Sequence, residues 1–222
     1  MSYFLVIISF LVALLVSFNV KHTYNKYSQV MSRRGYTADQ IARMILDQNG
    51  LHNVQVERVS GNLTDHFDPN SNVVRLSDSV YGKSSVAAIG VAAHECGHAI
   101  QYAEEYSPMK VRAAIIPITN IGSTLAYPLV LLGIILGGIQ PLITIGIWLF
   151  VAVVVFQLVT LPVEFNASGR ALKTLEQSGY LDEDELGQSR SVLIAAALTY
   201  VAALFTAVAQ LIRLIAISNR RN

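Results

Sequence analysis

The sequence of 222 residues is poor in charge: charged side chains make up 14% of it, whereas apolar residues make up 53%. Soluble domains usually carry about 25% charged residues. Asp, Glu, Lys and Arg are entirely absent from residues 1–20, 113–163 and 191–212. Since a membrane-spanning helix needs roughly 20 mostly apolar residues, these three runs indicate an integral membrane protein with a modest polar part.

Basic clusters and paired cysteines are missing as well. The formal net charge is +1 at pH 7, and there is no block of Lys and Arg of the kind that binds a phosphate backbone. We therefore expect no nucleic-acid partner. The single cysteine, Cys96, excludes an internal disulfide and says little about the compartment.

The alternation of apolar and polar stretches divides the chain into five segments. Residues 1–20 are expected to be a retained transmembrane anchor, because they contain no positively charged opening region and no small-residue cleavage site. Residues 21–112 form the main polar domain, and residues 113–163 are long enough for a transmembrane hairpin of two helices. Residues 164–190 are expected to form a polar helix, and residues 191–218 the last transmembrane helix.

The polar domain is predicted to combine helices with a small sheet. A capping box opens a helix within residues 36–51, and residues 53–59 alternate as in a strand. Residues 63–77 have the pattern of a β-hairpin, with turn-forming residues between two short strands. A second helix, rich in small residues and hence closely packed, is predicted within residues 84–106.

Two histidines and a glutamate in this second helix carry the clearest chemical signal. His94 and His98 are four residues apart, so on a helix they project about 40° from one another, and both imidazoles can reach one zinc ion. Glu95 lies about 100° round the helix from His94, where it can reach a water molecule more easily than the ion. This HExxH arrangement is typical of zinc metallopeptidases, with the glutamate as general base. Cys96, about 200° round from His94, is expected to face away and pack in the core.

A catalytic zinc ion also needs a third protein ligand and one open position. The HExxHxxGxxH spacing is absent, so that ligand must come from elsewhere in the chain. Glu164 is a candidate, because it is the first charge after the long uncharged run; an ordinary glutamate at a helix end is the alternative. His66 is the rival ligand, although such a histidine is more often an exposed strand residue.

The residues around these candidates resemble a known family. The segments AAHECGHAIQ and, far downstream, VEFNASGRA, with three or four spans around them and HFDPNSNVVRLS before the helix, are similar to the bacterial YugP-like zinc membrane peptidases. A wider resemblance is to HtpX-type and CAAX-prenyl-type membrane proteases, in which the glutamate of an E-x-x-x-D element is the third zinc ligand. The resemblance places that glutamate at Glu164. The aspartate of the element falls at Ser168, a departure from the wider pattern, and a serine cannot support a ligating histidine as a carboxylate can.

Motif and resemblance together imply a fold and an activity. The fold is an α-helical integral membrane protein with about four transmembrane helices and a small α+β gluzincin-like zinc peptidase domain. The activity is that of a zinc metalloendopeptidase, with zinc held by His94, His98 and Glu164, and with Glu95 passing a proton from the attacking water to the leaving amine. Substrates are expected to be protein or peptide chains at the lipid bilayer, and the strand at residues 73–77 could pair with them. A non-catalytic membrane scaffold with a structural zinc site is the alternative, but such a site has no use for a general base.

Basic residues near the spans bear on the orientation in the cell membrane. The residues that flank the spans on the side of the polar domain are Lys21, Lys26, Arg33, Arg34, Lys110 and Arg112. The positive-inside rule therefore predicts a multi-pass protein with a cytoplasmic catalytic domain. The C-terminal sequence NRRN, residues 219–222, falls on the opposite face if there are four spans, and it counts against this orientation.

Overall fold

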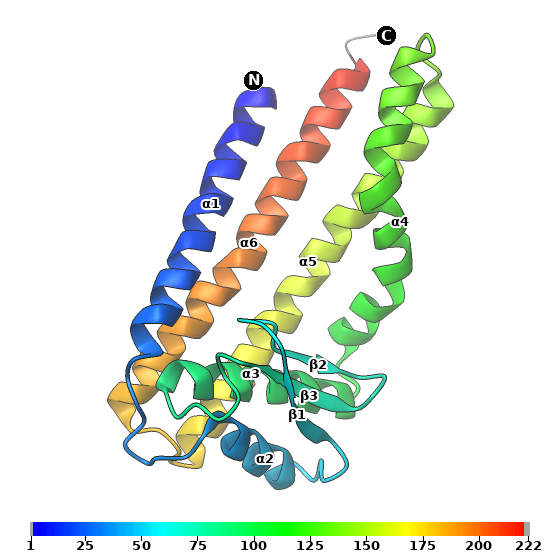
Figure 1. Ribbon diagram of the computed structural model, residues 1–222. Helices are drawn as coiled ribbons and strands as arrows, with labels where there is room; N and C mark the ends of the chain where they lie inside the picture. Colours follow the sequence, from blue (N-terminus) through cyan, green and yellow to red (C-terminus); the bar gives the residue numbers. More distant parts are fainter. Residues whose placement is uncertain (1, 220–222) are drawn as a thin grey trace. The chain divides into compact units, whose positions relative to one another are not determined.

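The structure is a computed structural model that describes residues 2–219 (Figure 1). Both arginines of the C-terminal NRRN, which bear on orientation, lie outside the described residues. The elements in chain order are α1 (Ser2–Tyr27), α2 (Ala38–Gln48), β1 (Gln55–Val59), β2 (His66–Asp68), β3 (Val73–Ser77), α3 (Val86–Ala103), α4 (Ser107–Ile135), α5 (Gln140–Gln177) and α6 (Glu183–Asn219). Within the described part of the chain, α1, α4, α5 and α6 are long and apolar enough to cross a membrane. The chain is thus mostly helical with a small sheet, as expected.

The chain divides into two compact units, and the described part of the first consists of helices and the loop at residues 136–139. It comprises residues 2–17, 107–162 and 198–219, and its buried apolar core is small: Ala126, Val130, Ile143, Phe150 and Leu214. Large apolar side chains are instead exposed, with Leu15 at 70% and Trp148 at 67%. Exposed apolar surface of this extent is costly in water and is typical of helices that face lipid.

The second unit comprises residues 18–106 and 163–197 and contains the sheet. β2 and β3 pair antiparallel, with His66 opposite Arg75, so the predicted hairpin is confirmed. β1 pairs with β3 in parallel, and the strand order is β1-β3-β2. The idea that residues 73–77 could pair with a substrate is therefore wrong, because β3 has a partner strand on each side and the edges belong to β1 and β2.

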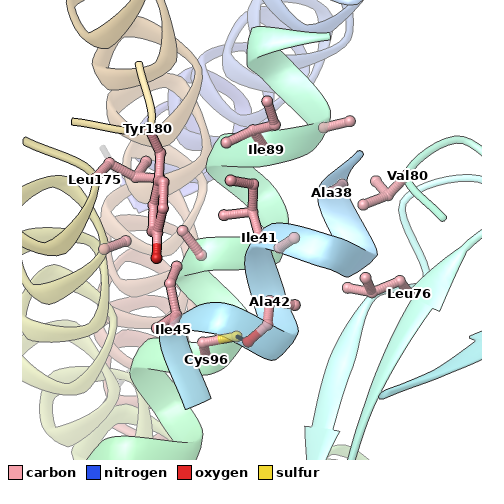
Figure 2. Close-up of a cluster of buried hydrophobic side chains, with 14 of the residues drawn as sticks. Ala38, Ile41, Ala42, Ile45, Leu76, Val80, Ile89, Cys96, Leu175 and Tyr180 are labelled. Atoms are coloured by element: carbon pink, nitrogen blue, oxygen red, sulfur yellow. Dashed lines mark hydrogen bonds between the residues drawn. The ribbon is translucent and has the colours of Figure 1, made fainter. Parts of the chain in front are cut away.

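The core of the second unit is centred on α2 and α3. Figure 2 shows part of this core, in which Ile41 and Ile45 of α2 are almost completely buried. Cys96 of α3 is fully buried there, and its thiol donates to the carbonyl oxygen of Ala42 at 3.5 Å. The predicted core position of Cys96 is confirmed. Ser85 caps α3 by accepting a hydrogen bond from the backbone N–H of Ala88 at 3.3 Å, which fixes where the motif-bearing helix begins.

Candidate metal centre

Two helical segments of the second unit bring the three candidate ligands together. α3 carries His94 and His98, and α5 carries Glu164. Glu164 Oε2 lies 3.3 Å from His94 Nε2 and 3.4 Å from His98 Nε2. Tetrahedral zinc with bonds near 2.1 Å holds its ligand atoms about 3.4 Å apart. The spacing of these atoms therefore fits one zinc ion.

The three side chains are withdrawn from solvent. Glu164 is 2% exposed and His98 8% exposed, while the side chain of His94 is 15% exposed. A glutamate at an ordinary helix end would be solvated, so this burial argues against that alternative for Glu164. A buried carboxylate facing two imidazoles is costly without a cation or a proton shared among them. The site is therefore suited to a divalent metal.

Each imidazole has a further polar partner at its other nitrogen. Nδ1 of His94 lies 3.1 Å from the hydroxyl of Ser168, and Nδ1 of His98 lies 3.0 Å from Oε1 of Gln101. Ser168 occupies the position at which the wider pattern has an aspartate, and its hydroxyl still reaches His94. Sequence reasoning missed Gln101, although its place three residues after His98 on one helix face was a usable signal.

A glycine inside the motif sets the distance between the two ligand-bearing helices. A Cβ atom added at Gly97 would lie 2.7 Å from the carbonyl oxygen of Ala167 on α5. Real Cβ atoms essentially never come so close to a backbone atom, so only glycine permits this approach. Close packing of α3, expected from its small residues, brings Glu164 and Ser168 within reach of the histidines.

Comparison with known proteins fits this geometry. A family model described as "Putative neutral zinc metallopeptidase" matches residues 2–219. The chain belongs to this family. The chain is also 49% identical, over 200 residues, to the "Putative membrane protease YugP" of Bacillus subtilis (strain 168), with 90% of the chain and 88% of that protein covered. No solved structure matches it.

These comparisons confirm the resemblance to YugP-like peptidases. The cofactor is zinc, and the chain carries His94, His98 and Glu164 as a group able to hold it. His66 is not part of the group that converges within residues 2–219. It is exposed, and its Nδ1 lies 2.8 Å from the carbonyl oxygen of Thr64.

The pKa values of Glu95 and His98 are both shifted by burial and by neighbouring charges in the motif. Burial raises the pKa of the Glu95 carboxyl, and the nearby charges of His94 and His98 oppose this rise. Burial by itself would lower the pKa of the His98 imidazole. The hydrogen bond between His98 and Glu164, together with the charge of Glu95, outweighs this effect of burial, so the pKa of His98 is raised. A carboxylate with a raised pKa beside a metal site is a better proton acceptor near neutral pH than a solvated one.

Proposed function

We propose that this protein is a membrane-embedded zinc metalloendopeptidase of the gluzincin type, which hydrolyses peptide bonds of proteins in or next to the bilayer. The proposed zinc ligands are His94, His98 and Glu164. The observation that carries the proposal is the buried convergence of these three side chains, with Glu95 next to the first of them in the chain.

The chemistry of the donor set supports a catalytic site over a structural one. Two imidazoles and one carboxylate are a ligand set of catalytic zinc sites, which keep the fourth position for water or substrate. A zinc ion held by His94, His98 and Glu164 would supply Lewis-acid chemistry, that is, polarisation of a scissile carbonyl group and a water molecule acidic enough to react at neutral pH. The role of Glu95 is to accept a proton from the attacking water and to deliver it to the leaving amine. A structural site in a scaffold protein would give Glu95 no such role.

The edge of the sheet offers a binding mode for an extended substrate. β2 is an edge strand, and its Phe67 ring contacts the ring of Tyr102, one helical turn after His98 on α3, with ring centroids 5.8 Å apart. An extended peptide can add to such an edge through main-chain hydrogen bonds. We therefore assign substrate pairing to β2 in place of β3.

The location of the ligands along the chain supports substrates at the membrane. Glu164 belongs to α5, one of the helices long and apolar enough to span the bilayer. The proposed partners are thus protein or peptide substrates and the bilayer itself. The basic residues near the spans, among them Arg33 and Arg34, support a cytoplasmic catalytic domain. Both arginines form ion pairs with Asp182, but the positive-inside rule counts Lys and Arg and depends little on acidic residues, so these ion pairs do not change the expected orientation.

The proposed function is tested by replacing the base while leaving the ligands. Wild-type protein and Glu95→Gln, purified in detergent, are compared for zinc content and for hydrolysis of unfolded casein. Glu95→Gln is expected to keep about one zinc per chain, but to lose roughly 10²–10⁴-fold in hydrolysis. Glu57→Gln, the same change at an exposed position of β1, is the matched control and should leave both unchanged. Equal hydrolysis by wild type and Glu95→Gln would contradict the proposed function, and zinc-loaded protein without any hydrolysis would favour the scaffold.

A further inference from the structure

The amide of Gln101 lies between the two helices that carry the candidate ligands. Gln101 is 0% exposed, and its side chain contacts Nδ1 of His98, the carbonyl oxygen of Val163 and the side-chain oxygen of Asn166. Val163 and Asn166 flank Glu164 on α5, whereas His98 is on α3. The buried side chain of Gln101 therefore connects the candidate ligand His98 to the α5 backbone beside Glu164, which is another candidate ligand.

The orientation of this amide follows from its neighbours. Arg170 Nε lies 2.7 Å from Asn166, and a guanidinium group can only donate, so the Asn166 atom that faces it is the oxygen Oδ1. That oxygen also lies 2.9 Å from the Gln101 amide, and the Val163 carbonyl oxygen lies 2.8 Å from the same atom of Gln101. Because both neighbours accept hydrogen bonds, the atom between them is the amide nitrogen of Gln101.

The orientation of Gln101 in turn determines the tautomer of His98. With its nitrogen turned toward α5, Gln101 presents Oε1 to Nδ1 of His98 at 3.0 Å. An amide oxygen only accepts, so Nδ1 of His98 carries a proton. In the neutral imidazole the lone pair is then on Nε2, the nitrogen that lies 3.4 Å from Glu164 Oε2. That nitrogen is the one a metal at this site would bind.

The other histidine lacks such a constraint. The partner of His94 Nδ1 is the hydroxyl of Ser168, at 3.1 Å. A hydroxyl group can donate or accept, so it is compatible with either tautomer of His94. The two ligands are therefore supported differently, and His98 is the one whose protonation pattern is fixed by the fold.

We propose that Gln101 is a positioning residue for zinc, which holds His98 in the tautomer with a free Nε2 and ties it to the α5 backbone beside Glu164. This inference rests on the proposed zinc site. Groups that hydrogen-bond to the outer nitrogen of a ligating histidine typically change metal affinity by roughly 10–100-fold. Gln101→Leu removes the acceptor and both donors at similar volume, so zinc should bind more weakly by a factor in that range.

The test measures the zinc dissociation constant in detergent by competition with a chromophoric chelator. Gln101→Leu is expected to weaken binding by about 10–100-fold, and Asn166→Leu, which removes one acceptor of the amide, by a smaller factor. Asn166→Asp keeps an acceptor for both Gln101 and Arg170 and should remain within roughly threefold of wild type. If Gln101→Leu does not fold, the pair of Asn166 variants decides, because equal affinities for Asn166→Leu and Asn166→Asp would overturn the proposal.

A spectroscopic readout separates positioning from general destabilisation. In zinc-loaded protein labelled with ¹⁵N-histidine, His98 should show a protonated, hydrogen-bonded Nδ1, and this signal should shift in Gln101→Leu. An unprotonated Nδ1 in wild type would overturn the inference. Wild-type protein that binds no zinc would refute the proposed function, whereas tight zinc binding that is unchanged in Gln101→Leu would refute only the role of Gln101.

Discussion

Gly97→Ala tests whether the close approach of α3 and α5 creates the metal site. Gly97 lies between the two candidate histidine ligands in the sequence but contacts the backbone of α5 at Ala167. The added methyl group changes neither a ligand nor a charge. Any effect on zinc must therefore come from the distance between the two helices.

The size of the effect follows from the contact at Ala167. The new Cβ would lie 2.7 Å from the Ala167 carbonyl oxygen, whereas ordinary van der Waals contact begins at 3.4 Å. The helices must therefore separate by roughly 0.7 Å there, because a backbone carbonyl cannot rotate away as a side chain can. Metal–ligand distances tolerate only about 0.2 Å of error. We expect Gly97→Ala to weaken zinc binding by at least about tenfold, and overpacking to cost about 1–3 kcal/mol of stability.

The assay is zinc affinity by chelator competition, with the melting temperature measured in parallel. Gly169→Ala is the matched control, because Gly169 is an exposed glycine of α5 and an added Cβ meets nothing within 4 Å. That variant should keep wild-type zinc affinity and gain about 0.5–1 kcal/mol from its higher helix propensity. Wild-type zinc affinity in Gly97→Ala would refute the argument that the spacing of the helices controls the site.

Further predictions concern the ligands, the core and the membrane. Glu164→Ala should lose zinc and hydrolysis together, whereas His66→Ala should retain both; zinc loss in His66→Ala, measured by metal analysis, would reverse the choice of ligand. Burial raises the pKa of the Cys96 thiol well above its usual value, so the thiolate forms only at more alkaline pH; native protein should resist maleimide at pH 8, and rapid labelling before denaturation would show that Cys96 is accessible. Single cysteines at the exposed positions Asn62 and Glu183, in a Cys96→Ala background, should be labelled from the same face of the membrane, and labelling from opposite faces would exclude a shared domain.

Much of the candidate site could be predicted from sequence. Its signals are either a short local motif or a charged residue that stands out against an uncharged stretch. The HExxH spacing is meaningful only on a helix, and small residues without proline, after a serine cap, predicted that helix. Glu164 stood out because a lone carboxylate follows a long uncharged run. The β2–β3 hairpin was predictable because a short turn joins strands that are adjacent in the chain.

The missed features depend on contacts between distant parts of the chain. The parallel pairing of β1 with β3, which makes β3 central, passes over β2, and nothing in a single sequence specifies such pairing. The sequence alone did not single out Gln101 as a site residue. Its position three residues after His98 suggests a contact with that imidazole, but its contacts with Val163 and Asn166, more than 60 residues away in the chain, could not be predicted from the local sequence.

The most direct test of the central claim is zinc K-edge X-ray absorption on purified wild-type protein and Glu164→Ala. For the wild type we predict a first shell of nitrogen and oxygen only, with two imidazoles at about 2.0–2.1 Å and a carboxylate oxygen at about 2.0–2.2 Å. Glu164→Ala should lose most of its zinc, and any zinc that remains should show an altered first shell. Full zinc occupancy with an unchanged spectrum in Glu164→Ala, or a sulfur ligand near 2.3 Å in the wild type, would contradict the assignment of His94, His98 and Glu164 as the metal centre.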